Sequence, residues 1–577
     1  MLSFRWSPAL DGRLRAAPPD PFMAPSPSAL APALAAPSLV ASPAGVAALV
    51  AAHCLGALGV GAGRTEATEL GSSRRLGSWA TYGAAAALAA LVVQYWPVLR
   101  PRRKPLPPGS AGWPFLLGHS LQLLGDVGGW LRAMHGRFGP TFRCCFFGTH
   151  VVVVDCDVYE RALSKLDSSA RFVPLWPTGF QRLLGRNALQ FLDGGSGSRG
   201  GRHRRLKRKV IDALSATELR LFLPRIEAIV RQEFESMVEE TAAHGHTALM
   251  PHAMRIVKQV ILELVLGPGA IRPEEYLQDT SKILLDGMIA APIDLGRFSA
   301  FGRAMGVRRN YRRDVERQLA AKLAEAAARG GQREAEAAHG AAAEGPSQTK
   351  TLLSRLTKEC EHGAGLSLVE MQDMLISLLF GGSLTTAETM QWALVELSRS
   401  DHWRGRLAEE QRRMAEVAAR GAGLAAAWGN SPPEGSRSPC PETLAACYET
   451  LRLHCPIDVL LRAMEEDVDL GGDCGTVPAG WWVAVHMTER GLRLGPEFDP
   501  SRWQGKAAAS EVTAFGLGPH VCVGRQLALW EIQTFLHVWL TGYDVEVMSD
   551  ETYHQTGLKR FKDGLPVKVR PLDKPRS

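Results

Sequence analysis

The feature that most constrains this chain is one cysteine inside a glycine-rich turn that leads directly into an apolar helix. The turn reads FGLGPHVCVG, from Phe515 to Gly524, and RQLALWEIQTFLHVWL follows it. Glycine permits tight turns, and the apolar repeat predicts a helix that begins just after Cys522. A cysteine at a helix start gains N–H donors and a favourable dipole for its thiolate. Such a thiolate could bind a haem iron. The alternative interpretation of Cys522 is a buried thiol without a chemical role.

Composition indicates a large globular chain without a nucleic-acid signature. The 577 residues are 46% hydrophobic, and 66 basic against 59 acidic residues leave a net charge of +7. This balance fits an acidic partner or an anionic membrane surface and does not imply nucleic acid. Ten cysteines without paired CxxC spacings indicate neither a disulfide scaffold nor a zinc site, and they favour a reducing compartment.

Three segments precede the predicted globular body. Residues 1–78 are rich in Ala, Pro and Ser and lack lysine, which is typical of a targeting or disordered leader. Residues 79–99 carry no charge and match the roughly 20 residues that a helix needs to cross a bilayer, so we expect a membrane anchor helix. A basic run and a Pro-rich hinge occupy residues 100–118. We therefore expect a membrane-bound protein, in the endoplasmic reticulum or a plastid.

The remaining residues, 119–577, predict a single body of α+β class that is predominantly α-helical. Long amphipathic patterns dominate, with short β-branched runs at 150–154 and 565–570. Ala/Gly-rich stretches near 324–348 and 415–440 show no apolar period, so we interpret them as loop insertions.

Two helical patterns upstream of the cysteine turn bear on chemistry. Glu449 and Arg452 share a helix face at i and i+3, so they can form an ion pair or reach a common partner. Alone, this spacing more often marks a surface pair. A long central helix starts at a capping box of Ser367 and Glu370. Its interior Gly381-Gly382 pair, followed by Thr385-Thr386, predicts either a local groove or close helix packing.

A third pattern is the strongly basic helix GRHRRLKRKVIDALS, which contains His203, Lys207 and Arg208. Its charge fits a solvated face, an electrostatic dock for an acidic electron donor, or donors for a ligand's carboxylates.

In this order, the motifs resemble the cytochrome P-450 superfamily, whose fold has small β-sheets and a long central helix. The turn matches the family's haem-binding signature FxxGxxxCxG at Phe515, Gly518, Cys522 and Gly524. The resemblance implies haem as cofactor, with Cys522 as the axial ligand of its iron. It also implies that four side chains contact the haem propionates: His520, His203, Lys207 and Arg462.

The resemblance assigns roles to the other motifs as well. Glu449 and Arg452 match the family's ExxR, and Arg502 lies in the matching FDPSRW segment, which implies a buried structural charge network. Gly382 and Thr385 match (A/G)GxxT, which implies a groove for dioxygen and a hydroxyl that helps to deliver protons. The chain departs from the pattern at Leu384, where relatives often carry an acid, and Glu388 one turn later is a candidate substitute.

The segments LPPGSAGWPFLLGHSLQLL and FVPLWPTGFQRLLGRNALQFLDGG are similar to the clan of retinoic-acid hydroxylases and plant oxidases of sterols, triterpenoids and hormones. This implies a monooxygenase that inserts one oxygen atom from O2 into an isoprenoid-derived substrate, such as a sterol, retinoid, carotenoid or terpenoid. No GxGxxG follows a predicted strand, so NADPH acts indirectly through a reductase or ferredoxin. The alternatives are an isomerase or dehydratase of lipid peroxides, suggested by Leu384, and a noncatalytic haem- or lipid-binding protein.

Overall fold

The computed structural model describes most of residues 104–572, apart from 113–117, 193–197, 268–279, 338–366, 429–437, 504–511 and a few shorter stretches. The predicted leader, at 1–78, and nearly all of the predicted anchor, at 79–99, lie outside the described residues. Within the described part, no helix is both long enough and apolar enough to cross a membrane. The chain divides into two compact units and passes from one to the other between Val158 and Tyr159 and within strands β5 and β8.

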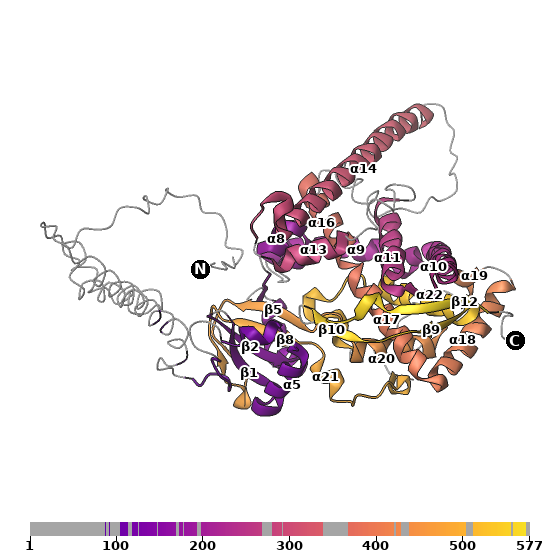
Figure 1. Ribbon diagram of the computed structural model, residues 1–577. Helices are drawn as coiled ribbons and strands as arrows, with labels where there is room; N and C mark the ends of the chain where they lie inside the picture. Colours follow the sequence, from indigo (N-terminus) through magenta and orange to yellow (C-terminus); the bar gives the residue numbers. More distant parts are fainter. Residues whose placement is uncertain are drawn as a thin grey trace, which may run out of the picture. The chain divides into compact units, whose positions relative to one another are not determined.

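The larger unit comprises the described residues of 159–461 and 485–577 and is mostly helical (Figure 1). Local signals set several helix ends. The predicted capping box of Ser367 and Glu370 starts α16, and Gly245, at φ 81°, ends α10. The helices are α7 (Ser164–Ser168), α8 (Thr178–Leu184), α9 (Ser198–Ala213), α10 (Ala216–His244), α11 (Leu249–Leu266), α13 (Thr280–Ile289), α14 (Ala300–Ala337), α16 (Leu368–Gly381), α17 (Leu384–Arg399), α18 (Asp401–Ala419), α19 (Gly423–Ala427), α20 (Pro441–Leu453), α21 (Glu489–Leu492) and α22 (Arg525–Gly542).

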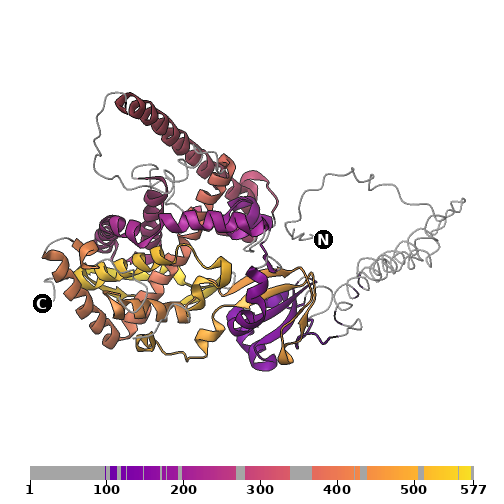
Figure 2. The ribbon, with the colours of Figure 1, turned by 180° about the vertical axis from the view of Figure 1, so that it is seen from behind.

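The main core of this unit lies among α10, α11, α17, α18, α20 and α22. Phe234 of α10 and Phe535 of α22 meet there, with their ring centroids 5.3 Å apart. Figure 2 shows α10, in magenta, running along the yellow C-terminal elements that include α22. Burial of apolar area fixes α22, and with it the turn that precedes this helix.

Short strands complete the larger unit. Strand β12 pairs antiparallel with β9 and, at its first residues, with β4, while β10 and β11 form an antiparallel hairpin. Their bounds are β3 (Phe172–Pro174), β4 (Thr247–Ala248), β9 (Tyr543–Val547), β10 (Thr552–Gln555), β11 (Leu558–Phe561) and β12 (Pro566–Pro571).

The smaller unit comprises the described residues before 159 together with 462–484. Strands β1, β2, β8 and β5 are neighbours in that order, and β1 pairs antiparallel with β2 in the register Thr141↔Val154. The elements are α5 (Val127–Phe138), α6 (Cys156–Val158), β1 (Thr141–Phe146), β2 (Thr149–Asp155), β5 (Val459–Met464), β6 (Val468–Asp469), β7 (Thr476–Val477) and β8 (Trp482–His486).

The predicted helix-dominated α+β class is confirmed, and the two β-branched runs fold as β2 and β12. The loop predicted near 324–348 is wrong in its first part, because α14 continues to Ala337. The stretch near 415–440 is likewise helical up to Ala419 and again in α19. Alanine has the highest helix propensity. A sequence without apolar residues at helical spacing can therefore still form a helix, although it presents no apolar face to a core.

Candidate active site

The predicted cysteine turn is a closed loop at the start of α22. The backbone N–H of Cys522 donates to the carbonyl of Phe515 at 2.8 Å. Gly516 and Gly518 adopt φ angles of 83° and 65°, which residues with a side chain rarely adopt. Gly524 caps α22, and Cys522 as a whole residue is exposed, although the protein around its thiol still desolvates it. A ligand can therefore reach this residue.

The surroundings of Cys522 have two opposite effects on the pKa of its thiol. Desolvation by the surrounding protein is the largest influence and raises the pKa of the thiol above its ordinary value. Hydrogen bonds from the backbone N–H groups of Gly524 and Arg525, and the positive charges of Lys207 and Arg525, favour the thiolate. An iron cation at the sulfur would add the missing counter-charge and hold the thiolate form.

The basic helix α9 contacts the cysteine loop directly. The ammonium of Lys207 donates to the carbonyl oxygens of Pro519 and Val521 at 2.6 and 2.8 Å. The ring of His203, which is buried, lies 4.5 Å from the ring of His520, measured between centroids. The structure thus brings together three of the side chains predicted to contact propionates. Lys207 in addition ties α9 to the loop backbone, a role that the sequence did not suggest.

Glu449 lies at the centre of a buried charge network. Its carboxylate is 0% exposed and accepts from Arg452 Nη2 at 2.7 Å and Nε at 2.8 Å. It also accepts from the backbone N–H of Asp499 at 2.9 Å and from the indole N–H of Trp503 at 2.8 Å. Arg502 Nε lies 3.4 Å from the same carboxylate. The three residues predicted to form a network are therefore in contact.

Arg452 completes the network on the other side. Besides its two bonds to Glu449, Nη1 donates to the carbonyls of Gly491 and Gly495, and Nη2 donates to the carbonyl of Glu497. These five bonds match the five N–H donors of a guanidinium. The pair thus joins α20 to the backbone at 491–499, and this connection orders the chain that leads to the cysteine turn.

The predicted groove in the central helix is a break between α16 and α17. The N–H of Gly382 donates to the carbonyl of Leu378, and Thr385 Oγ1 donates to the carbonyl of Gly381 at 3.2 Å. A Cβ on Gly381 would have no atom within 4 Å, whereas a Cβ on Gly382 would lie 1.9 Å from Ile261 Cδ1. Gly382 therefore permits close packing, as one interpretation of the glycine pair requires, and the groove stays a prediction.

Glu388, the candidate substitute for an acid at Leu384, is buried on α17 and faces β11. Its Oε1 lies 3.0 Å from Nε of Arg560. Burial raises the pKa of Glu388 to about 7, and the guanidinium of Arg560 acts in the opposite direction. The carboxyl thus contacts the β10–β11 hairpin.

Arg462, the fourth predicted propionate contact, lies in β5 in the smaller unit and is 4% exposed. Its contact stays a prediction, as do the catalytic roles of Gly382 and Thr385.

The residues at the turn fit a haem in two respects. Cys522 is an exposed residue whose sulfur accepts from backbone N–H groups, as an axial thiolate requires. Lys207 and the two imidazoles lie beside it, where they could donate to carboxylates.

The comparisons with known proteins agree with this geometry. The cytochrome P450 family model matches residues 107–561. Abscisic acid 8'-hydroxylase 1 of Arabidopsis thaliana is 25% identical over 80% of this chain and 91% of its own length. Ent-kaurenoic acid oxidase 1 of the same plant is 26% identical over 77% of this chain and 86% of its own length.

The fold has a counterpart among solved structures. A retinoic acid bound cyanobacterial CYP120A1 superposes with a TM-score of 0.63 at 22% sequence identity and covers 81% of this chain and 100% of its own. Because the family model spans most of the sequence, the chain belongs to the cytochrome P450 family and is a haem-thiolate monooxygenase.

Proposed function

We propose that Cys522 binds the haem iron and that the enzyme inserts one oxygen atom from O2 into a hydrophobic, isoprenoid-derived substrate. The observation that carries the proposal is the position of Cys522, an exposed residue at the start of α22, with N–H groups of Gly524 and Arg525 hydrogen-bonded to its sulfur. Such a thiolate is hydrogen-bonded yet accessible, which an axial ligand needs.

When bound, the haem supplies oxygen activation, using electrons that NADPH delivers through a reductase or ferredoxin. The chain's own residues supply the surroundings. Lys207 holds the cysteine loop through the carbonyls of Pro519 and Val521, and Glu449 orders the segment that leads to it. The hydroxyl of Thr385, which donates to the carbonyl of Gly381 at the helix break, would be the group that passes on protons there.

The relatives support the isoprenoid substrate class. Their names specify abscisic acid, ent-kaurenoic acid and, for an enzyme of Paris polyphylla that is 26% identical over 81% of this chain, cholesterol. All three compounds are isoprenoid-derived, although their shapes differ, so the class carries over better than any single compound.

A reduced carbon-monoxide difference spectrum tests the iron ligand. We expect a thiolate-type Soret band in the wild-type protein and its loss in Cys522→Ala. Cys455→Ala, a half-buried cysteine in the described part, is the matched control and keeps the band. A band that persists in Cys522→Ala would refute the ligand assignment.

Turnover separates the rival functions. With reductase, NADPH and O2, a panel of sterols, diterpenoid acids and apocarotenoids should give a product that carries one ¹⁸O atom from ¹⁸O2. Product formed from a lipid peroxide without NADPH would favour the isomerase. Haem uptake without any turnover would favour the noncatalytic binder.

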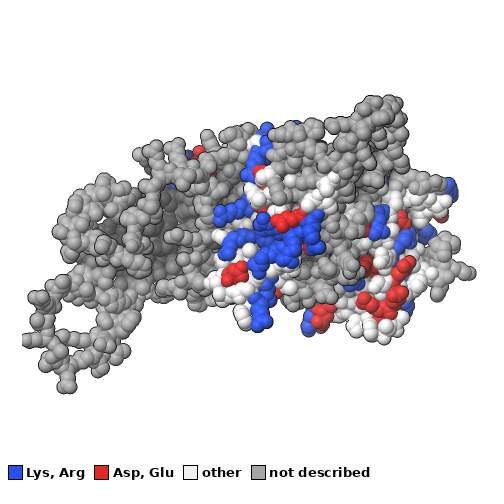
Figure 3. Space-filling view, turned by 90° about the horizontal axis from the view of Figure 1, so that it is seen from above, with Lys and Arg blue, Asp and Glu red and all other residues white. Residues whose placement is uncertain are grey.

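We also propose that the protein lies at a membrane, where hydrophobic substrates partition. Besides the uncharged segment 79–99, support comes from three exposed apolar side chains between α13 and α14. Ile293, Leu295 and Phe298 are 45%, 61% and 79% exposed. Figure 3 shows basic side chains gathered over the first part of α14, whose exposed arginines are Arg303, Arg309, Arg312, Arg313 and Arg317. Apolar side chains beside cations suit an anionic lipid surface.

Fractionation and hydrogen exchange test the membrane proposal. We expect the full chain to resist carbonate extraction from endoplasmic reticulum or plastid membranes. In proteoliposomes, the amides of 292–299 should exchange more slowly with anionic than with zwitterionic lipid, and Leu295→Ser with Phe298→Ser should abolish the difference. Recovery of the chain in the soluble fraction would overturn the proposal.

A further inference from the structure

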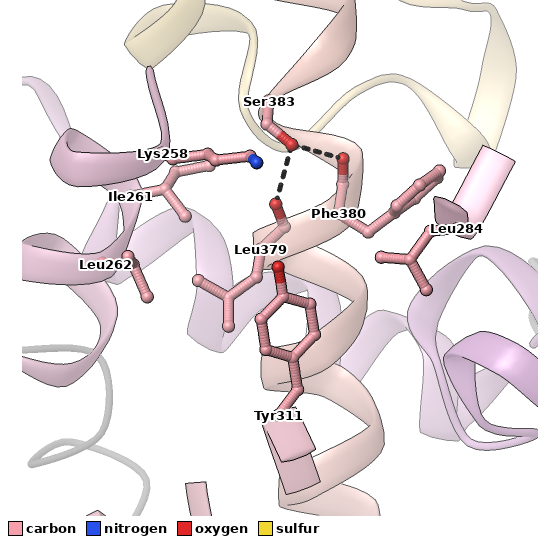
Figure 4. A pocket seen from close by; sticks show the side chains of 8 residues that line it. All are labelled: Lys258, Ile261, Leu262, Leu284, Tyr311, Leu379, Phe380 and Ser383. Carbon is pink, nitrogen blue, oxygen red and sulfur yellow. Dashed lines mark hydrogen bonds between the residues drawn. The ribbon is translucent and has the colours of Figure 1, made fainter. Parts of the chain in front are cut away.

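A small cavity lies beside the break between α16 and α17, and three polar side chains meet in it (Figure 4). Lys258 of α11, Tyr311 of α14 and Ser383 of the break are 6%, 8% and 3% exposed. Figure 4 shows the ammonium of Lys258 pointing towards the hydroxyl of Ser383, and the phenol of Tyr311 pointing into the same space. The other lining residues are apolar: Ile261, Leu262, Leu284, Leu379 and Phe380.

The ammonium of Lys258 lies in a cavity whose other polar side chains are Ser383 and Tyr311. Oxygen atoms face it. Ser383 Oγ donates to the carbonyls of Leu379 at 3.0 Å and Phe380 at 3.1 Å, so its lone pairs point away from those carbonyls. Lysine is only a donor, whereas a hydroxyl both accepts and donates. The hydroxyl of Ser383 can therefore accept from the ammonium of Lys258 while it donates elsewhere.

Ser383 of the break lines this cavity, and Gly381 and Gly382 directly precede it. Gly382 faces Ile261, a cavity-lining residue, while a Cβ on Gly381 would meet nothing within 4 Å. Thr385, two residues beyond Ser383, donates to the carbonyl of Gly381. The cavity has a volume of about 20 Å³, which is enough for one water molecule.

We propose that Lys258 and Ser383 supply protons to Thr385, in place of the carboxylate that this chain lacks at Leu384. The inference rests on the oxygen insertion proposed above. That reaction consumes two electrons, which NADPH supplies, and two protons for each O2, and yields one hydroxylated product and one water.

In the proposed relay, each group that gives up a proton receives another. The Ser383 hydroxyl turns from the carbonyls of Leu379 and Phe380 to a water at the break and gives that water its proton, as the Lys258 ammonium gives a proton to Ser383 Oγ. The water then gives a proton to Thr385. The amine of Lys258 then takes a proton from solvent by way of the Tyr311 hydroxyl. Both residues act through Thr385 and do not touch the substrate.

The test compares Lys258→Met, Ser383→Ala and Lys258→Arg in the full chain with its reductase. Interrupted proton supply releases reduced oxygen as peroxide. We therefore expect the ratio of product to peroxide to fall at least about tenfold in Lys258→Met and Ser383→Ala, as for lost general acids. The solvent isotope effect on turnover should rise. Lys258→Arg should not restore the wild-type ratio, because a guanidinium keeps its protons, and a restored ratio would overturn the relay. Lys562→Met, at an exposed lysine in the larger unit, is the matched control and keeps the wild-type ratio.

A measurement without turnover tests the contact itself. In the ferric protein, ¹³C resonances of methylated lysines report the titration of Lys258, which Lys258→Met identifies by a missing peak. Ser383→Ala should shift the Lys258 midpoint by at least about half a unit if hydroxyl and amine interact.

Each outcome of these experiments supports or overturns one part of the proposal. An unshifted midpoint would overturn the contact. Reduced thermal stability of either variant with an unchanged product-to-peroxide ratio would mean that the residues only cap freed carbonyls, and would overturn the relay. Absence of product in the wild-type protein would instead refute the proposed oxygen insertion.

Discussion

Replacement of Glu449 by glutamine should cost about 4 kcal/mol of the free energy of unfolding, although it changes hardly any volume. The carboxylate is fully buried and accepts four hydrogen bonds from Arg452, Asp499 and Trp503. All of its partners are donors. Glutamine has only one oxygen, so whichever way the amide turns, its NH2 group faces two other donors.

The magnitude follows from the burial of the pair. Removing one partner of a buried ion pair leaves an uncompensated charge and typically costs about 3–5 kcal/mol. Arg452 keeps its three carbonyl partners at 491, 495 and 497, so we expect the middle of that range. A loss of this size is a large share of the roughly 5–15 kcal/mol by which folded proteins are stable.

Urea unfolding at pH 7.5, followed by circular dichroism, measures this loss, and haem retention reports the same change at the site. The matched control is Glu409→Gln, where a carboxylate that is 62% exposed pairs with Arg413. It should cost less than about 0.5 kcal/mol, because surface pairs contribute little. A loss below about 1 kcal/mol for Glu449→Gln, or one equal to the control, would refute the reasoning.

Three further predictions concern single contacts. Burial raises the pKa of Glu388 from 4.5 to about 7, so the wild-type protein loses stability as pH rises through this window. Between pH 5 and pH 8, unfolding should show Glu388→Gln gaining about 2.5 kcal/mol relative to wild type, whereas a difference that does not change with pH would contradict the shifted pKa. Gly382→Ala should lower stability by about 1–3 kcal/mol through its clash with Ile261 Cδ1, and Ile261→Val, which lacks that atom, should recover part of the loss on thermal unfolding. Lys207→Met should speed hydrogen exchange in the loop 515–524 because two loop carbonyls lose their donor, and unchanged exchange would dismiss this role.

Local chemistry explains what could be predicted from the sequence. The capping box at Ser367, the turn around Cys522 and the i, i+3 pair of Glu449 and Arg452 each depend on residues a few positions apart, and all are present in the structure. The prediction of a loop was wrong for the alanine-rich part of α14, which is helical up to Ala337, because it did not weigh the helix propensity of alanine.

Contacts between distant segments depend on packing, and no spacing reveals them. Lys207 meets carbonyls more than 300 positions later in the chain, and Trp503 reaches Glu449 across 54 positions. Lys258 of α11 points at Ser383 because Gly382 lets the two helices pack closely. The sequence by itself determined the family, the cysteine turn and the absence of an acid at Leu384. Only the tertiary structure decided which side chains surround that position, because burial against the core sets which faces of α11, α14 and α16 meet.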